Sequence, residues 1–407
     1  MLLETKATEM DAVDGLARFR EYFHIPDGVI YLDGNSLGVM PRRAPGRLVE
    51  VATREWADGL IRSWDEAGWI ELPLTVGNRI APLIGVGAGE VAVGDSTSVN
   101  LFKCLAAALR MRPERKVVLL EKDNFPTDNY MAEGLAALVG SIEVRFFETL
   151  EKIDSDVAVV LLSHVHYRTA RMQEMAAVTR AVHEAGALVI WDLSHSTGAV
   201  KVDLQKADAD FAVGCSYKYL NGGPGAPAFV WVAPRLVNDA QQPLSGWMGH
   251  ADPFAFASGY EPGRAIKRFV CGTPQVLSLT ALDECLKVWE EVDLEWLFEK
   301  SRKMTEFFIE LVERECAGHG LVLQSPRSVS ERGSHVSFGL ENGYAVMRAL
   351  RDRGVIGDFR APDTMRFGVT PLYLSYTDLE KAVGVLKTVL DGRSWDAEKY
   401  RVRGTVT

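Results

Sequence analysis

The stretch of sequence that decides the fold reads FAVGCSYKYLNGGPG and covers residues 211–225. Its first half is an apolar run typical of a buried strand, and its second half is a tight Gly/Pro loop. Lys218 stands where the two halves meet, between two tyrosines. Most lysines after strands simply point into solvent, but burial between such neighbours favours the neutral, nucleophilic amine that forms Schiff bases.

A second apolar run, ALVIWDLSH at residues 187–195, contains Asp192, which lies 26 residues before Lys218. Pyridoxal phosphate is held as a Schiff base to a lysine. Its ring withdraws electrons only while a carboxylate keeps the pyridine nitrogen protonated. A lysine and an aspartate at the ends of two strands are therefore the residues that a pyridoxal phosphate enzyme needs.

Composition fits a soluble enzyme. The 407 residues are 47% hydrophobic and 25% charged, enough to bury one large core and a smaller one. The net charge of -10 gives no sign of nucleic-acid binding. The five cysteines lack C-x-x-C spacing and are odd in number, which indicates reduced thiols in the cytoplasm. No signal-peptide pattern opens the chain and no apolar run reaches the roughly 18 residues of a membrane span, so we expect no membrane partner.

Strands and helices alternate through the middle of the chain. This predicts an α/β fold whose large domain has a mostly parallel sheet covered by helices. We expect strands at 116–120, 142–147, 157–162, 187–192, 211–216 and 228–233, and helices at 98–111 and 170–185. Ligands bind at the carboxyl ends of strands in such sheets, and Asp192, Ser216 and Lys218 fall at such ends.

The C-terminal part of the chain changes character. It predicts a long helical stretch at 282–314, short strands at 334–338 and 365–369, and a final helix that starts at a capping box at Thr377 and runs to Asp391. We therefore expect three divisions. They are a large cofactor-binding domain at 51–281, a smaller α+β domain at 282–407, and an N-terminal segment at 1–50 that joins the smaller domain.

Two further patterns bear on ligands. The run GDSTSVN at residues 94–100 precedes an apolar helix, so its hydroxyl groups could hold a phosphate at the helix N-terminus, although the same run is also a good plain N-cap. Glycines at 85–89 lack the G-x-G-x-x-G spacing and indicate a turn. His164 and His166 have no third ligand evident nearby, so we expect no metal site.

Six short motifs complete the pattern. They read YLDGNSLG at 31–38, NFPTD at 124–128, DLSHS at 192–196, SYKYLN at 216–221, GWMGH at 246–250 and RFG at 366–368. In this order, over nearly the whole chain, they resemble the kynureninases, which are fold-type I pyridoxal phosphate enzymes of the aspartate aminotransferase superfamily.

The resemblance implies roles for residues that match the family's motifs. Lys218 would form the Schiff base and move the substrate α-proton, Asp192 would pair with the ring nitrogen, and Tyr217 would bond the phosphate and assist proton transfer. Phe125 would stack on the ring. The other implied cofactor contacts are Ser96, Thr97, Thr127, Asp128, Ser163, His195, Trp247 and Thr273. Plain core or surface roles also fit Phe125, Trp247 and His195.

On the substrate side, the resemblance implies that Arg366 binds the α-carboxylate in a bidentate fork, which a lysine could not reproduce. Arg366 also fits a surface arginine that ends a strand. Trp64, Ser36 and Asn35 would line the substrate site. The implied reaction is hydrolysis of L-kynurenine to anthranilate and L-alanine in tryptophan catabolism. An apolar Trp64 offers nothing to an added hydroxyl, so 3-hydroxykynurenine is expected to be the weaker substrate.

The resemblance also implies a homodimer, with residues 46–59 and 259–274 as contributors. Two other functions remain. Cysteine desulfurases and selenocysteine lyases have a similar arrangement but use a cysteine on a mobile loop of the smaller domain, whereas Cys316 lies in an expected helix. A cofactor-sensing regulator would need a DNA-binding helix-turn-helix, for which neither terminus offers room or basic charge.

Overall fold

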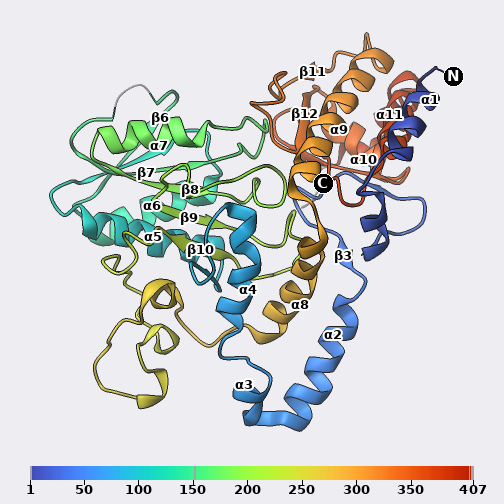
Figure 1. The fold of residues 1–407 in the computed structure, drawn as a ribbon. Coiled ribbons are helices and arrows are strands. Elements are labelled where there is room, and N and C mark those ends of the chain that lie inside the picture. The colour runs from blue at the N-terminus through green and yellow to red at the C-terminus, as the bar shows by residue number, and fades with distance from the viewer. Residues whose placement is uncertain (1, 151–152, 403, 405–407) are drawn as a thin grey trace.

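The computed structural model describes residues 2–150, 153–402 and 404. A large sheet with helices packed against it forms one part of the molecule, and a smaller sheet with its own helices forms the other (Figure 1). The blue N-terminal and red C-terminal segments meet in the smaller part. The expected α/β fold with a mostly parallel large sheet is confirmed.

The large sheet has seven strands in the order β4-β10-β9-β8-β7-β5-β6. Strands β6, β5, β7, β8 and β9 run parallel, whereas β10 pairs antiparallel with both β9 and β4. The strands are β4 (Val91–Val93), β5 (Val117–Glu121), β6 (Glu143–Phe147), β7 (Val157–Ser163), β8 (Leu188–Asp192), β9 (Phe211–Gly214) and β10 (Phe229–Val232).

Six of these strands were predicted to within two residues at each end. Every residue of β5, β7, β8, β9 and β10 is buried, so these strands are continuous apolar runs that stand out in the sequence. The seventh, β4, was missed because its three residues are too few to form a pattern.

The helices are α1 (Leu2–Ala12), α2 (Ala44–Glu50), α3 (Ser63–Glu66), α4 (Leu72–Ile80), α5 (Thr97–Met111), α6 (Pro126–Val139), α7 (Met175–Glu184), α8 (Val276–Leu286), α9 (Leu294–Glu315), α10 (Gly343–Arg351), α11 (Tyr376–Asp391) and α12 (Glu398–Arg401). Shorter turns of 3₁₀ or π geometry are η1 (Ala17–Tyr22), η2 (Val51–Gly59), η3 (Leu60–Arg62), η4 (Ala81–Ile84), η5 (Trp247–Gly249), η6 (Pro253–Ala255), η7 (Ala265–Phe269), η8 (Lys287–Glu291) and η9 (Ser394–Asp396).

The helix expected at 170–185 begins five residues late, at Met175. Ala170 has a φ of 61°, a left-handed conformation that cannot continue a right-handed helix. The Glu174 side chain accepts a hydrogen bond from the backbone N–H of Ala177 and so caps α7 at its observed start.

The long helical stretch expected at 282–314 is wrong as a single element. It is divided among α8, the turn η8 and α9. Asp293 has extended backbone angles and its side chain accepts from the N–H of Trp296, which makes it the N-cap of a new helix. The domain boundary expected between residues 281 and 282 falls inside α8.

The smaller sheet is antiparallel with the order β11-β12-β15-β14. Its strands are β11 (Val322–Leu323), β12 (His335–Gly339), β14 (Asp358–Arg360) and β15 (Thr364–Gly368). The two strands expected here, at 334–338 and 365–369, are confirmed with a shift of one residue each.

The capping box of α11 was placed two residues too late. Ser375 caps the helix and exchanges hydrogen bonds with Asp378, whereas Thr377 is already helical. Thr377 instead donates its hydroxyl and its backbone N–H to Asp11. The expected end of the helix at Asp391 is confirmed.

The N-terminal segment lies against the C-terminal half of the chain. Helix α1 packs on α11, and β2 (Ile30–Tyr31) pairs parallel with β13 (Val355–Ile356). In the same segment, β1 (Phe23–His24) pairs antiparallel with β3 (Met40–Pro41). These contacts place the motif at 31–38 beside β15, where Asp33 forms an isolated bridge with Gly368.

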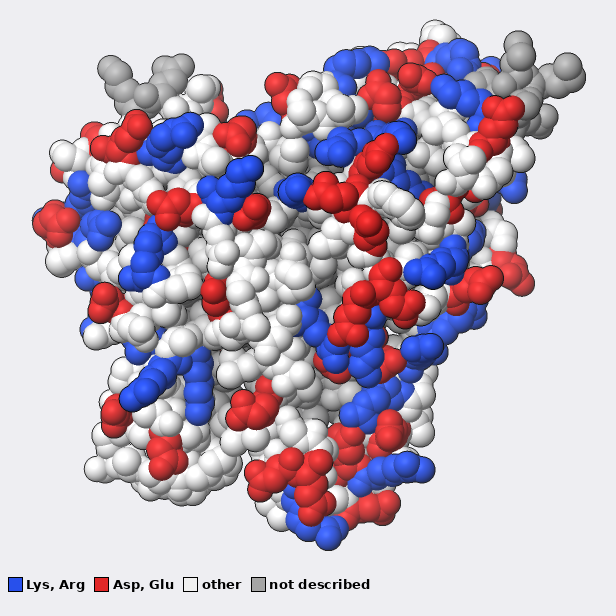
Figure 2. Space-filling view, in the orientation of Figure 1, with Lys and Arg blue, Asp and Glu red and all other residues white. Residues whose placement is uncertain are grey.

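Two arms project at the bottom of the view in Figure 1. One carries α2 and α3, and the helix expected at 46–59 is present there as α2 continued by the π-helical η2. The other, drawn in yellow, includes residues 259–274, which contain η7. On the face shown in Figure 2, acidic and basic side chains are interspersed, with no broad basic area on that face. None of the helices in the described residues is both long and apolar enough to cross a membrane.

A buried ion pair ties the N-terminal segment to α9, and it gives a first prediction. Lys300 Nζ lies 2.6 Å from Asp14 Oδ2, with side-chain exposures of 7% and 6%. Lys300→Met leaves the Asp14 carboxylate buried without a cation, so the free energy of unfolding should fall by about 3–5 kcal/mol. Thermal unfolding followed by circular dichroism measures the loss.

Lys303→Met is the matched control, because Lys303 is on the same helix but pairs with Glu299 in solvent. It should cost about 0–1 kcal/mol. Equal melting temperatures for the two variants would contradict a stabilising role for the buried pair.

Candidate functional site

Three parallel strands bring the predicted site residues to one edge of the large sheet. Strand β7 ends at Ser163 and β8 ends at Asp192, and these two residues are register partners. Strand β9 ends at Gly214, shortly before Lys218. Parallel strands present their carboxyl ends at the same edge, so this topology gathers the serine, the aspartate and the lysine at one site.

Lys218 lies in an enclosed, polar environment. It is 9% exposed, and its Nζ lies 3.0 Å from His195 Nε2. Burial, followed by the charges of Lys218 and His335, lowers the pKa of His195 well below its usual value. A neutral His195 can accept a hydrogen bond from the lysine amine. The Nζ also lies 5.8 Å from the ring centres of both Phe125 and Tyr217.

Two carboxyl groups lie together near the lysine. Burial, followed by the charge of Asp192, raises the pKa of Asp128 well above its usual value. Asp192 Oδ1 accepts a hydrogen bond of 2.8 Å from the backbone N–H of Ser194. Of the two groups, Asp128 is the one whose burial beside Asp192 favours the neutral carboxylic acid.

Asn124 joins this pair to β7, a role that the sequence did not reveal. Ser163 Oγ donates to Asn124 Oδ1, and Asn124 Nδ2 donates to Asp128 Oδ2 at 3.1 Å. Thr127 lies half-buried in the first turn of α6, next to Asp128. The only signal for Asn124 in the sequence is its position at the head of the NFPTD motif.

The run GDSTSVN forms the N-terminus of α5, as expected. Ser96 is the N-cap, with its Oγ accepting from the N–H of Val99, and Thr97 opens the helix. Backbone N–H groups at such a terminus favour an anion. Lys103 is buried beneath this turn, 2.5 Å from Asp95, and was not predicted because its partner lies on the preceding loop.

Aromatic side chains connect the two arms. The rings of Trp64 and Trp247 meet edge to face, with centres 6.2 Å apart. Thr273 is exposed, and the segment that carries it runs beside the start of η5, since a Cβ added at Gly246 would lie 2.0 Å from the carbonyl oxygen of Cys271. The structure thus places Thr273 on a segment neighbouring Trp247.

Arg366 is buried and already engaged. Its Nε and one terminal nitrogen donate to the two oxygens of Asp358, the same terminal nitrogen donates to Ser36 Oγ, and the other donates to the backbone carbonyl of Tyr167. A guanidinium has five N–H groups, so these bonds leave one uncommitted. The expected bidentate fork toward a substrate carboxylate therefore cannot form in this conformation unless one existing acceptor is displaced.

Several buried polar atoms around Lys218 and Arg366 lack a hydrogen-bond partner within the residues that the structure describes. They include both side-chain amide atoms of Asn35, Nδ1 of His195, both ring nitrogens of His335 and the hydroxyl of Tyr219. Buried polar groups are normally hydrogen-bonded, so these atoms mark a region suited to a polar ligand. Asn35 and Ser36, both predicted from the YLDGNSLG motif, lie in this region.

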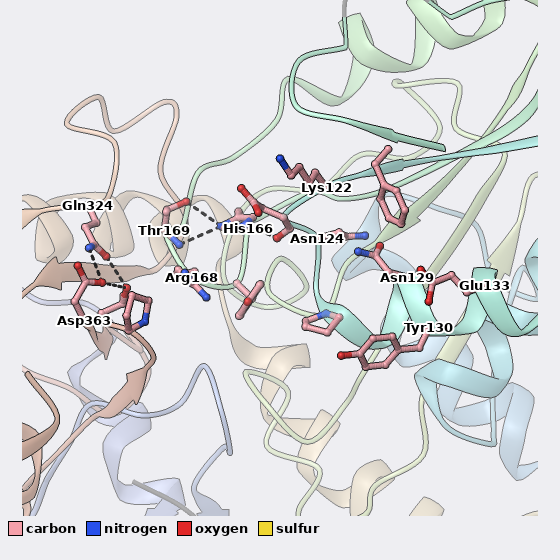
Figure 3. Close-up of a pocket in the computed structure, with 16 residues that line it drawn as sticks. Lys122, Asn124, Asn129, Tyr130, Glu133, His166, Arg168, Thr169, Gln324 and Asp363 are labelled. Atoms are coloured by element: carbon pink, nitrogen blue, oxygen red, sulfur yellow. Dashed lines mark hydrogen bonds between the residues drawn. The ribbon is translucent and has the colours of Figure 1, made fainter. Parts of the chain in front are cut away.

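A cleft of about 780 Å³ opens beside the site, between loops of the large sheet and residues 362–364 of the smaller part (Figure 3). Asn124, His166 and Arg168 line one side of it. The Tyr167 ring, also in its wall, meets the ring of Phe125 edge to face at 5.4 Å.

The two histidines near β7 have partners other than a metal. His164 Nδ1 lies 3.0 Å from Ser196 Oγ, and His166 Nε2 donates to the carbonyl of Asp123 at 2.7 Å. Burial lowers the pKa of His164 to about 4. Among the described residues, no three His, Cys, Asp or Glu side chains form a cluster suited to a metal ion.

Sequence comparison with named proteins shows the family of this chain. The chain is 52% identical to a kynureninase from Pseudomonas fluorescens, with 98% of each chain covered. The chain belongs to the kynureninase family. It is also 49% identical to a kynureninase from Burkholderia pseudomallei over the full length of both chains. The family model described as the kynureninase C-terminal domain matches residues 297–386.

Solved structures similar to this fold are much less similar in sequence. An apo cysteine desulfurase from Thermococcus onnurineus covers 92% of this chain with a TM-score of 0.78 at 18% identity, and 98% of that chain is matched. A C-DES variant with glycine covalently linked to its PLP cofactor covers 90% of this chain and is itself 98% covered, with a TM-score of 0.76 at 16% identity. At such identities the likeness extends to the fold alone.

Proposed function

We propose that this member of the kynureninase family hydrolyses L-kynurenine to anthranilate and L-alanine, with pyridoxal phosphate as its cofactor. The observation that carries the proposal is a buried lysine beside the carboxyl ends of β7 and β8, in a chain 52% identical to a kynureninase along its length. The proposed setting is tryptophan catabolism in the cytoplasm.

The residues present fit the cofactor. Lys218 is buried, and its amine forms no ion pair with a carboxylate among the residues that the structure describes. Asp192 offers a carboxylate for the ring nitrogen, and Phe125 offers a ring face near the lysine. Ser96 and Thr97 at the N-terminus of α5 would hold the phosphate, together with Tyr217 and Trp247. When bound, pyridoxal phosphate supplies an electron sink for negative charge at the substrate α-carbon.

The chain's own residues then handle the protons. Neutral His195 orients the Lys218 amine through the 3.0 Å contact, and Lys218 takes the substrate α-proton. Tyr217 keeps its phenol proton, because the neighbouring Cys215 and burial both raise its pKa. It can therefore donate to the phosphate or assist proton transfer. Ser163, His195 and Thr273 would complete the lining of the site.

The overall reaction balances with one water. Water adds to the side-chain ketone of kynurenine, and the bond between that carbonyl carbon and the β-carbon breaks. The carbonyl carbon leaves as the carboxylate of anthranilate, and the β-carbon gains a proton to give L-alanine. Trp64 and Asn35 would contact the substrate, and the uncommitted N–H of Arg366 would meet its α-carboxylate.

The first test is direct. Purified protein with pyridoxal phosphate should convert L-kynurenine to anthranilate, followed by its fluorescence, and Lys218→Ala should abolish this activity. With 3-hydroxykynurenine the specificity constant should be lower, since Trp64 is largely apolar and its indole offers no acceptor for the extra hydroxyl. A higher constant for the hydroxylated substrate would overturn the preference, and inert L-kynurenine would overturn the function.

The alternative function, cysteine desulfuration, is tested by assaying the protein with cysteine in parallel. Cys316 follows the last turn of α9, is buried, and has its pKa raised to about 11 by that burial. A catalytic thiol needs an accessible thiolate, so Cys316 is poorly suited to desulfuration. With an added thiol reductant to release the transferred sulfur, formation of alanine and sulfide from cysteine that is lost in Cys316→Ser would favour the alternative.

The two carboxyl groups should differ in importance. Asp192→Asn should retain the cofactor, seen by its absorbance, yet lower turnover by orders of magnitude, because the ring nitrogen loses its carboxylate. Asp128→Asn replaces a group that favours its neutral form, so turnover should stay within about tenfold, or 1.4 kcal/mol in the barrier. Near-normal turnover in Asp192→Asn would contradict the assignment.

The protein is proposed to act as a homodimer. The two arms expose apolar side chains that a second copy would cover, namely Trp56, Leu60, Ile61, Phe254 and Phe256. Exposed apolar patches of this kind commonly mark protein interfaces.

Sedimentation velocity tests the dimer. The unmodified protein should sediment as a dimer, and Ile61→Glu should shift it toward the monomer by placing a charge in the interface. Leu138→Glu is the control, because Leu138 on α6 is comparably exposed, at 74% against 77% for Ile61, but lies away from the arms. A monomeric unmodified protein, or equal effects of both substitutions, would contradict this interface.

A further inference from the structure

Two arginines and two aspartates form one cluster behind the proposed substrate site, in which Arg366 and Asp358 are buried and Arg360 and Asp33 are partly exposed. Asp358 receives hydrogen bonds from Arg366, and its Oδ2 also lies 2.8 Å from Arg360. Asp33 faces the same cluster from the N-terminal segment, held beside β15 by its bridge to Gly368. Three separate stretches of chain thus contribute to one set of charges.

Asp33 differs from Asp358 in its contacts. Asp358 is held by both arginines and by the hydroxyl of Ser36 at 2.8 Å. Asp33 Oδ1 is buried and has no hydrogen-bond partner within the described residues. Both arginines contact Asp358 directly, whereas Asp33 has only Ser36 and the more distant charges of these arginines to offset its burial, so its charge is the less compensated of the two.

The other titratable groups around Asp33 are neutral. Burial raises the pKa of Tyr31, Tyr219 and Tyr373, so their phenols keep their protons. Burial lowers the pKa of His335, which sits across from Gly368 in the smaller sheet. The net charge of the cluster is therefore set by the two arginines and the two aspartates.

That net charge depends on one proton. With both aspartates ionised, two positive and two negative charges cancel, and the cluster offers a carboxylate no net attraction. With Asp33 protonated the cluster carries one positive charge, which matches a single substrate carboxylate. Burial, followed by the charge of Asp358, raises the pKa of Asp33 to about 7, so this carboxyl group gains or loses its proton near neutral pH.

We propose that Asp33 is a positioning residue for the substrate carboxylate, and that binding of this carboxylate at Arg366 is coupled to uptake of a proton by Asp33. The inference rests on the proposed function, because it takes the α-carboxylate of the substrate as the ligand. Coupling is reciprocal, so an anion that favours protonated Asp33 binds best where Asp33 is already protonated. The affinity of the enzyme for the carboxylate is then highest below about pH 7 and falls as the pH rises above that value.

The probe is 4-(2-aminophenyl)-4-oxobutanoate, which keeps the aryl ketone and the carboxylate of kynurenine but lacks its α-amino group. Binding to the cofactor-loaded enzyme is measured by isothermal titration calorimetry between pH 6.5 and 8.5, in buffers of different ionisation enthalpy. At pH 8 uptake should approach about one proton per site, and Kd should rise by up to about tenfold per pH unit above pH 7.

Three controls isolate Asp33. Asp33→Asn is neutral at every pH, so its affinity should match the low-pH affinity of the unmodified enzyme throughout, without proton uptake. Asp352→Asn, a change just after α10 at an aspartate that pairs with Lys399 in solvent, should keep the pH dependence of the unmodified enzyme. The primary amide of the probe carries no charge and should bind without proton uptake by the unmodified enzyme, which tests the inference even if Asp33→Asn folds poorly.

The outcomes separate the two proposals. If the carboxylate probe binds with the same affinity and proton uptake as its amide, or if Asp33→Asn keeps the pH dependence, the role of Asp33 is wrong while hydrolysis of kynurenine stands. If the probe does not bind and L-kynurenine yields no anthranilate, both proposals are overturned.

Discussion

The buried contact between Arg366 and Asp358 lies where three parts of the chain meet beside the site. The same guanidinium bonds to Ser36 of the N-terminal segment and to the carbonyl of Tyr167 on a loop of the large sheet. Removing one partner of such a pair leaves an uncompensated charge in a low-dielectric interior, which is strongly unfavourable. The pair thus holds the N-terminal segment and the smaller sheet against the loop of the large sheet, whose strands place Lys218.

Much of the fold was predictable because its signals are local. Strands buried on both faces are apolar runs, so β5 and β7 to β10 stand out, and Asp192 and Lys218 follow from their positions at strand ends. The failures have local causes as well. The break at Asp293 comes from a single capping side chain within an otherwise helical composition, and the late start of α7 comes from one left-handed residue, Ala170.

The structure gathers Ser163, Asp192 and Lys218 at one edge of the large sheet, as their positions at strand ends predicted, but the contacts of the candidate residues were less predictable. The motifs supplied the candidates, whereas the partners of each depend on contacts between distant segments that leave no mark in the sequence. Asn124 was part of the NFPTD motif but had no predicted role. Arg366 was expected to bind a substrate carboxylate through a guanidinium edge that, in the structure, binds Asp358. The charge state of a buried carboxyl such as Asp128 depends on its neighbours in space, so it required the structure.

The edge-to-face contact between Trp64 and Trp247 has a consequence for altering this protein's selectivity. One indole belongs to the proposed aryl pocket and the other to the proposed phosphate anchor. A smaller side chain at residue 64, chosen to admit a larger ring, would also remove the surface that supports the second indole. A change at residue 64 that alters the substrate range is therefore expected to affect cofactor binding as well. Libraries should vary both tryptophans together.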